Sequence, residues 1–390
     1  MEDDTRTPTR RQLLGTGAVI GSGLLAGCSG TDGTATPAEE DSATESATPT
    51  ASATATPDQG YSVAMAPVGE VEFDDVPEDW LPYTGDYADM GVALGQADGL
   101  QGIGLKARYG SHYYDELPGV SVDGEALTAL YDGGTGKEIF YEVDADVHVI
   151  DPNFMINRLG WSESDVAEVG ENVGPFAGNT TFSRAYDWHD YDYYSLYGAF
   201  EKVAEIFQQR ERYEAFAALH DEVIADVESR LPEERPDLAL LYPAGIPPES
   251  FYPYLIGEGT QAKQWRDLGV GDALAQHDVT DAQAGGSTVD FETLLEIDPD
   301  ALAIRLQGEI TDSYFEENVR TPLEEHDVAS QLTAVQNDRV IYGGLTYQGP
   351  IIHLFQLEAA ARGLYPDSFG GEQLFDRQRV ADIVNGEFDA

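Results

Sequence analysis

The sequence has 390 residues and carries 72 Asp and Glu against 21 Lys and Arg, which gives a formal net charge of −51. This charge argues against nucleic acid as a partner, because a phosphate backbone would be repelled. The acidic residues are spread along the chain, as is typical of proteins adapted to high salt, where counterions screen the self-repulsion. The length allows two domains in addition to a leader and a tether.

Residues 1–27 are predicted to be an export signal. Arg10 and Arg11 stand directly before a short apolar segment, a pattern that resembles a twin-arginine signal. The segment ends in Leu-Ala-Gly-Cys at residues 25–28, which resembles the lipobox of exported lipoproteins. Lipid on Cys28, the only cysteine, would anchor the protein to the extracellular face of the cell membrane.

Residues 28–60 are rich in Ser, Thr, Pro and Glu and contain no aromatic residue. A segment of this composition cannot bury enough apolar surface to offset the entropy of ordering. We therefore expect a disordered tether between the lipid and the folded protein.

Residues 61–192 are predicted to form an N-terminal α/β lobe, with a helix over 85–95 and a strand over 100–105. The loop after this strand concentrates basic and aromatic side chains, namely Lys106, Arg108, Tyr109, His112 and Tyr113. Ligands of open α/β sheets bind at the carboxyl ends of strands, so this loop is a candidate ligand site. The alternative is a solvated surface loop.

Aromatic residues are dense between positions 180 and 197, a segment that also includes Arg184 and Trp188. They could line a cleft or pack against the helix that follows, and the pattern favours neither. His148 lies inside the strand predicted within residues 142–150, where a structural role is expected.

Residues 199–231 contain no Gly or Pro and place apolar residues at helical spacing, which predicts one long helix of about 50 Å. Arg210 and His220 interrupt its apolar stripe. A helix of this length can join two lobes, and we assign residues 193–231 to an interlobe helix. A long core helix within one domain is the alternative.

Residues 232–390 are predicted to form a C-terminal α/β lobe, with strands over 238–242 and 338–342 and helices over 260–268, 291–296 and 350–362. Residues 296–304 repeat the order of residues 142–150, with an acid, an aliphatic residue, Asp, a turn residue, Asp and a strand. We interpret the two as equivalent units of related lobes. Tyr252, Arg305 and Tyr347 are the candidate ligand contacts of this lobe.

Taken together, these motifs resemble those of the substrate-binding lipoproteins of ATP-driven (ABC) importers for ferric siderophores, haem and cobalamin. The acidic composition indicates that this chain comes from a halophilic archaeon. The resemblance depends on Ala-Leu-Gly at 93–95, the two repeated units, the single interlobe helix and the sequence of residues 332–342. It implies two Rossmann-like α/β lobes that face each other across a cleft, joined by one long interlobe helix, the class III periplasmic-binding-protein-like fold. It also implies an acidic residue on each lobe that docks the permease, for which Asp89 and either Asp267 or Glu258 are the candidates.

This resemblance implies a monomer that captures a ferric siderophore and delivers it to the permease and ATPase subunits of a transporter. Lys106, Arg108, Arg184 and Arg305 would bind anionic oxygens, while tyrosines pack the organic shell. Cobalamin or haem is the alternative ligand, with Tyr113 or His112 as an axial ligand of haem iron.

We expect no intrinsic cofactor, because the seven histidines show no metal-site spacing. The serine-nucleophile, zinc-protease and phosphate-loop motifs are absent, so a binding protein is favoured over an extracellular hydrolase. An adhesion protein is disfavoured because long polar repeats are absent.

Overall fold

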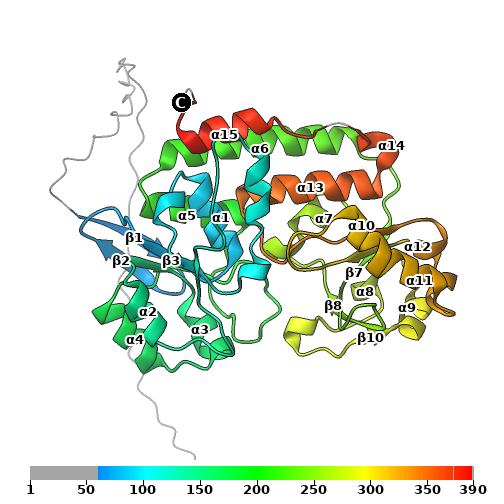
Figure 1. The fold of residues 1–390 in the computed structure, drawn as a ribbon, viewed down its shortest axis with the longest axis horizontal. Coiled ribbons are helices and arrows are strands. Elements are labelled where there is room, and N and C mark those ends of the chain that lie inside the picture. The colour runs from blue at the N-terminus through cyan, green and yellow to red at the C-terminus, as the bar shows by residue number, and fades with distance from the viewer. Residues whose placement is uncertain (1–59, 372, 389–390) are drawn as a thin grey trace, which may run out of the picture. The chain divides into compact units, whose positions relative to one another are not determined.

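The computed structural model describes residues 60–371 and 373–388, which belong to one compact unit. Figure 1 shows their arrangement. The predicted signal of residues 1–27, the candidate lipidation site Cys28 and the tether up to residue 59 lie outside the described residues. Within the described part of the chain, no helix is long and apolar enough to cross a membrane.

The strands and helices alternate irregularly along the chain. The strands are β1 (Tyr61–Met65), β2 (Gly69–Phe73), β3 (Trp80–Pro82), β4 (Gly102–Ile103), β5 (Thr128–Ala129), β6 (Val147–Val149), β7 (Asp237–Pro243), β8 (Ser250–Tyr254), β9 (Gly271–Asp272), β10 (Val289–Asp290), β11 (Ala301–Ile304) and β12 (Val340–Tyr342). The helices are α1 (Gly85–Ala93), α2 (Glu138–Val143), α3 (Pro152–Leu159), α4 (Glu163–Asn172), α5 (Leu196–Ile206), α6 (Arg210–Arg230), α7 (Lys263–Asp267), α8 (Ala273–Gln276), α9 (Phe291–Ile297), α10 (Asp312–Phe315), α11 (Thr321–Glu325), α12 (Thr333–Gln336), α13 (Pro350–Leu364), α14 (Pro366–Phe369) and α15 (Arg377–Asn385).

The N-terminal lobe contains short parallel strand pairs. β3 pairs with β6, and β4 pairs with β5, while single bridges join Trp80 to Leu100 and His148 to Phe176. The predicted strand over 100–105 is therefore reduced to β4. His148 is fully buried between aromatic rings, and burial lowers its pKa to about 4, which agrees with the structural role expected for it.

The C-terminal lobe is built on one sheet with the strand order β10-β8-β7-β11-β12, in which β9 also pairs with β7. β11 lies between β7 and β12 and is parallel to both. Parallel neighbours end at the same edge of a sheet, so the loops after β7, β11 and β12 leave the sheet together. This edge carries two of the candidate ligand residues, Arg305 and Tyr347.

The two repeated units found in the sequence adopt the same structure. Asp144 directly follows α2 and Asp298 directly follows α9, and both residues have left-handed backbone, with φ of 53° and 46°. Two residues further on, the backbone N–H of Asp146 donates to Asp79 and that of Asp300 donates to Asp237, at 2.8 and 2.9 Å. Each unit therefore joins a helix to a strand through the same turn.

The stretch over 199–231 is two helices, so the prediction of one uninterrupted helix is wrong. α5 ends at Ile206 and α6 begins at Arg210, and between them Gln208 has a φ of +54°. A left-handed residue cannot continue the hydrogen-bond ladder of a right-handed helix. α6 alone has 21 residues and spans about 30 Å. Its buried residues Phe216, Leu219, Val223 and Val227 lie on one face.

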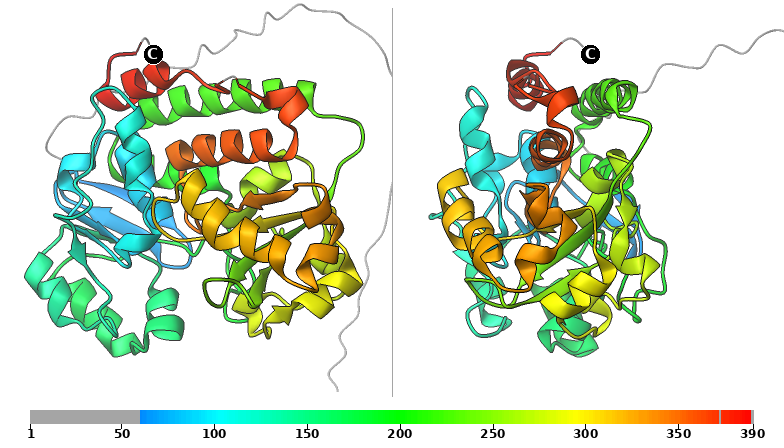
Figure 2. Two further views of the ribbon diagram at one scale, coloured as in Figure 1. Left: turned by 45° about the vertical axis from the view of Figure 1, so that its right-hand side comes forward. Right: turned by 90° about the vertical axis from the view of Figure 1, so that its right-hand side faces the viewer.

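α13 is the central helix between the two lobes. It contacts α1 of the N-terminal lobe and α7 of the C-terminal lobe, and most of its residues are buried. Figure 2 shows α6, α13 and α15 together on one side of the strands of both lobes. The largest apolar core draws residues from all these parts, including Trp80, Met90, Phe216, Trp265 and Ile351.

The N-terminus of α13 is held by a carboxylate from α1. Asp89 is fully buried, and its Oδ2 accepts hydrogen bonds from the backbone N–H groups of Ile351 and Ile352, both at 2.9 Å. Tyr114 donates its hydroxyl to Oδ1 at 2.7 Å. These bonds satisfy amides that the helix itself leaves unpaired.

The matched turns of the repeat give a stability prediction. Asp144→Gly should stabilise the fold by roughly 0.5 kcal/mol, because glycine adopts left-handed backbone without a side-chain clash. Asp298→Gly should instead destabilise it by about 1 kcal/mol, because the Asp298 carboxylate accepts bonds from the N–H and hydroxyl of Thr333, at 2.9 and 2.8 Å. Urea denaturation of both variants measures the difference, and equal effects would contradict this account.

Candidate functional site

Arg305 lies at the carboxyl edge of the C-terminal sheet, directly after β11. Its side chain is fully buried, and its guanidinium donates to the Oε1 of Gln261 at 3.2 Å and to the backbone oxygen of the same residue. The guanidinium carbon lies 5.2 Å from the ring centroid of Tyr254, at the end of β8. Burial lowers the pKa of Arg305 to about 10, so the side chain keeps its charge at neutral pH.

Arg108 reaches the same region from the N-terminal lobe. It ends the 3₁₀ turn Lys106–Arg108, which follows β4, and its guanidinium interacts electrostatically with Tyr347 and Tyr254. Burial alone would lower the pKa of Arg108, but the tyrosines around it, Tyr347 and Tyr254 among them, raise it overall. We call Arg108, Tyr254, Arg305 and Tyr347 the Arg–Tyr cluster, in which each lobe supplies one guanidinium group.

The turn after β12 allows the close packing of this cluster. Gly343 lies against the main chain of β11, where an added Cβ would be 2.8 Å from the backbone nitrogen of Arg305. The next residue, Gly344, has a φ of +78°. A side chain at either position would push the loop, and Tyr347 with it, away from Arg305.

The lobes meet through main-chain hydrogen bonds of residues that neighbour, in the chain, the Arg–Tyr cluster or side chains in contact with it. The N–H of Gly308 donates to the oxygen of Ala107 at 2.8 Å, and the N–H of Thr260 donates to the oxygen of Thr181 at 2.9 Å. We call these two bonds the interlobe seam. Close to it, Arg184 forms an exposed ion pair with Glu258, a contact of a kind that contributes little to stability.

The aromatic segment of residues 180–197 packs beside the cluster. The ring of Phe182 meets Tyr347 edge-on, with centroids 5.1 Å apart, and Trp188 stacks on Tyr186 at 4.9 Å. Arg184 lies over the ring of Tyr193 at 4.4 Å. The segment therefore borders the Arg–Tyr cluster with several rings.

The structure does not bring the other candidate ligand residues into the Arg–Tyr cluster. Lys106 donates to the backbone oxygen of Glu125 at 2.6 Å, and Tyr109 is buried against Tyr114. Tyr252 is 42% exposed on β8. The remaining two are His112 and Tyr113, whose rings lie 4.3 Å apart, with Tyr113 also stacked on Phe355.

The acidic residues considered for permease docking differ in exposure. Asp89 is fully buried as the cap of α13, so it cannot offer its carboxylate to another protein, and the docking prediction for it is wrong. Asp267 has a side chain that is only 14% exposed, and Lys263 bonds both of its oxygens. Glu258, with a side chain 70% exposed, is the accessible candidate.

Sequence reasoning missed Tyr254 because it missed β8. Residues 250–254 include Pro253, which is disfavoured in a strand interior, yet β8 pairs antiparallel with β7. The available signal was the alternation of Tyr252 and Tyr254, which places both rings on one face of a strand.

The chain belongs to the periplasmic binding protein family, because the family model matches residues 83–345. Its fold is of the class III type, with two α/β lobes and no closed barrel. The members and structural neighbours are binding proteins rather than enzymes, which is consistent with the expectation from the sequence. No curated protein matches the sequence closely enough to count as a relative.

Solved structures confirm the fold. The haem binding protein HmuT is 19% identical with a TM-score of 0.55, over 81% of this chain and 93% of its own. The petrobactin-binding protein YclQ from Bacillus subtilis is 15% identical with a TM-score of 0.56, over 78% and 99%. PiuA from Streptococcus pneumoniae, an iron uptake ABC transporter substrate-binding protein, is 15% identical with a TM-score of 0.53, over 78% and 98%.

The buried carboxylate of Asp89 gives a pH prediction. Burial raises its pKa to about 7, although bonds from Ile352, Tyr114 and Ile351 act in the opposite direction. An unfolded Asp titrates near pH ~4, so the folded chain holds a proton between pH ~4 and 7 that the unfolded chain has lost. The stabilisation from this group is present below pH ~4 and is lost as the pH rises through 7.

Asp89→Asn removes this titration. The difference in unfolding free energy between the parent and the Asn variant should therefore fall as the pH is raised from 4 to 8. Urea denaturation at several pH values measures it. Parallel profiles for the two proteins would show that Asp89 does not titrate in this range.

Proposed function

We propose that this protein captures a chelated ferric iron complex, a ferric siderophore, outside the cell and delivers it to the permease and ATPase subunits of an ABC importer. The observation that carries the proposal is the Arg–Tyr cluster, with one guanidinium group from each lobe among tyrosine rings. Anionic chelate oxygens suit guanidinium donors, and the organic shell of a chelate suits aromatic rings.

The charge of the protein sharpens this argument. A body with a net charge of −51 repels an anionic ligand at long range, so local cations must provide the attraction. At molar salt the Debye length is about 3 Å, and only groups in direct contact with the ligand act on it. Arg108, which is only partly buried, and the exposed Arg184 near the interlobe seam would be such groups, whereas the fully buried Arg305 would have to be uncovered before it could contact a ligand.

The neighbouring structures support an iron-related ligand. They are a haem binding protein, a petrobactin-binding protein and a substrate-binding protein for iron uptake. Haem and cobalamin are the alternative ligands here. For haem, His112 or Tyr113 would have to supply the axial ligand, but the Tyr113 ring is stacked on Phe355, which favours the siderophore.

The location follows from the N-terminal sequence. Export by the twin-arginine pathway and lipid on Cys28 would place a monomeric protein on the extracellular face of the cell membrane, and the acidic composition fits a halophilic archaeon. Residues 28–60 would act as the tether, and residues 61–192 and 232–390 as the two lobes. We retain Glu258 as the acidic residue that contacts the permease.

Ligand binding tests the function. Fluorescence titration in molar salt against catecholate, carboxylate and hydroxamate ferric siderophores, haem and cobalamin should show binding to a ferric siderophore. Arg108→Ala should weaken binding of an anionic chelate by about 1–3 kcal/mol, because it removes a charge-assisted contact. Arg210→Ala, an exposed arginine on α6, is the control and should leave affinity unchanged.

Two results would contradict the proposal. If only haem or cobalamin binds, that molecule is the ligand in place of a ferric siderophore. If no member of the panel binds, the protein does not bind metal chelates of these classes. Equal affinities for the Arg108→Ala variant and the parent would remove the Arg–Tyr cluster from the binding site. Mass spectrometry of a small molecule that co-purifies identifies the ligand directly.

The anchor has its own test. Cys28→Ser removes the thiol that would carry lipid, so the variant should move from the membrane fraction to the medium, as measured by immunoblotting of both fractions. Retention of the variant in the membrane fraction would show that another segment holds it there.

A further inference from the structure

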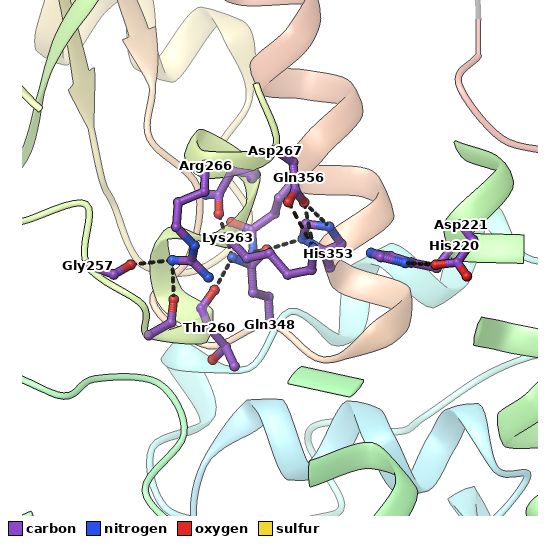
Figure 3. Close-up of polar contacts among 12 residues, drawn as sticks. His220, Asp221, Gly257, Thr260, Lys263, Arg266, Asp267, Gln348, His353 and Gln356 are labelled. Atoms are coloured by element: carbon purple, nitrogen blue, oxygen red, sulfur yellow. Dashed lines mark hydrogen bonds and ion pairs between the residues drawn. The ribbon is translucent and has the colours of Figure 1, made fainter. Parts of the chain in front are cut away.

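Three potential metal ligands from three helices converge away from the Arg–Tyr cluster. His220 lies on α6, Asp267 at the end of α7 and His353 on α13, and Figure 3 shows how they lie. One ligand atom from each lies within 4.8 Å of the others. The Nε2 of His353 is only 2.9 Å from the Oδ2 of Asp267.

The hydrogen bonds of Gln348 fix the tautomer of His353. The amide nitrogen of Gln348 donates to the oxygen of Thr260 at 2.6 Å and to the Oε1 of Gln264. Its Oε1 therefore faces the Nδ1 of His353, at 3.2 Å, and can only accept a hydrogen bond. The Nδ1 of His353 must then carry the ring proton, which leaves a lone pair on Nε2.

This lone pair points at another acceptor. His353 is fully buried, and its Nε2 makes no hydrogen bond within the described residues although the Asp267 carboxylate is adjacent. A lone pair beside a carboxylate oxygen is unfavourable unless a cation lies between them.

His220 presents a second free imidazole nitrogen to the same place. Its Nδ1 lies 3.3 Å from the Oδ1 of Asp221, which orients the ring with a carboxylate, as is common for metal-binding histidines. Its Nε2 is buried and makes no hydrogen bond within the described part of the chain.

Solvent reaches two of the three residues, His220 and Asp267, through a hollow, and His353 lies buried behind them. A pocket of about 390 Å³ is lined by His220, Asp221, Lys263 and Asp267, among others. An ion can enter by this route, and a water molecule has room to complete its coordination.

We propose that His220, Asp267 and His353 bind one divalent transition-metal ion of the Zn²⁺ type, with solvent as the fourth ligand. Two imidazoles and one carboxylate are ligands that such ions prefer. Metal–ligand bonds of about 2.0–2.1 Å place tetrahedral ligands roughly 3.3 Å apart. The His353–Asp267 distance is already close to this value, and His220, whose ligand atom lies within 4.8 Å of the other two, would move closer on binding the ion. The bound ion joins α6 to α7 and α13.

The positive charge of Lys263 should weaken binding of the metal ion, so a variant without this charge gives a test whose direction is known in advance. Its ammonium nitrogen lies 2.9 Å from Oδ1 and 2.8 Å from Oδ2 of Asp267. The ion and the ammonium group compete for Oδ2, and their charges repel. Removal of the Lys263 charge should therefore tighten metal binding, whereas removal of a ligand should weaken it.

Cobalt titration of the chelator-treated full chain tests the site. Every variant carries Cys28→Ser, because a thiolate would itself bind cobalt. Co²⁺ alone is added in molar potassium chloride, and visible absorption is recorded, since tetrahedral nitrogen-ligated Co²⁺ absorbs strongly whereas Co²⁺ on surface carboxylates absorbs weakly. We expect one equivalent with strong absorption, which Zn²⁺ abolishes by displacement.

Substitutions test whether the cobalt absorption comes from the proposed metal ligands. His220→Ala should weaken cobalt binding by at least about tenfold, and Lys263→Gln should strengthen it. His277→Ala, which changes an exposed histidine elsewhere in the C-terminal lobe, is the matched control and should have no effect. Circular dichroism of each variant confirms that it is folded.

Two results overturn the proposal. One is that Co²⁺ gives no strong absorption with the parent chain, and the other is that the His220→Ala variant still gives this absorption and binds Co²⁺ with the same affinity as the parent. If His220→Ala does not fold, Lys263→Gln decides, because a purely structural network would give no tighter cobalt binding when its ammonium group is removed.

Discussion

The buried carboxylate of Asp89 connects the parts of this protein. It lies on α1 in the N-terminal lobe and accepts the first free amides of α13, which in turn packs on α7 of the C-terminal lobe. A buried carboxylate without such partners would carry a large desolvation cost. Since α13 is covered by α6 and shares its core with both lobes, the relative placement of the lobes depends on how this one helix begins.

Local chain signals predicted the repeated units correctly. The order of residues around 142–150 and 296–304 encodes a helix end, a left-handed turn at Asp144 or Asp298 and a strand, all within nine positions. The predicted positions of Arg305 and Tyr347, on loops that follow strands, are likewise those of the structure, while their role in ligand binding stays a prediction. The break at Gln208 could not be predicted, since glutamine has no preference for left-handed backbone and no Gly or Pro marks the position.

Contacts between distant segments could not be predicted from the sequence, because they depend on how strands and helices pack in three dimensions. Tyr254 joins the Arg–Tyr cluster through β8, whose pairing with β7 overrides the presence of Pro253. His220, Asp267 and His353 lie far apart in the chain and share no motif spacing, so only the packing of α6, α7 and α13 brings them together. The role of Asp89 was also hidden, because its burial depends on α13.

The interlobe seam has a consequence for how such a protein can diversify. Both of its bonds join main-chain atoms, Gly308 to Ala107 and Thr260 to Thr181, so neither uses a side-chain group, and only the left-handed backbone of Gly308, with a φ of +83°, favours a particular residue type. The cationic and aromatic side chains of the Arg–Tyr cluster can therefore be exchanged during evolution while the lobes keep meeting in the same way. Such a division between a constant scaffold and a variable lining would let one architecture acquire new cargoes by point mutation.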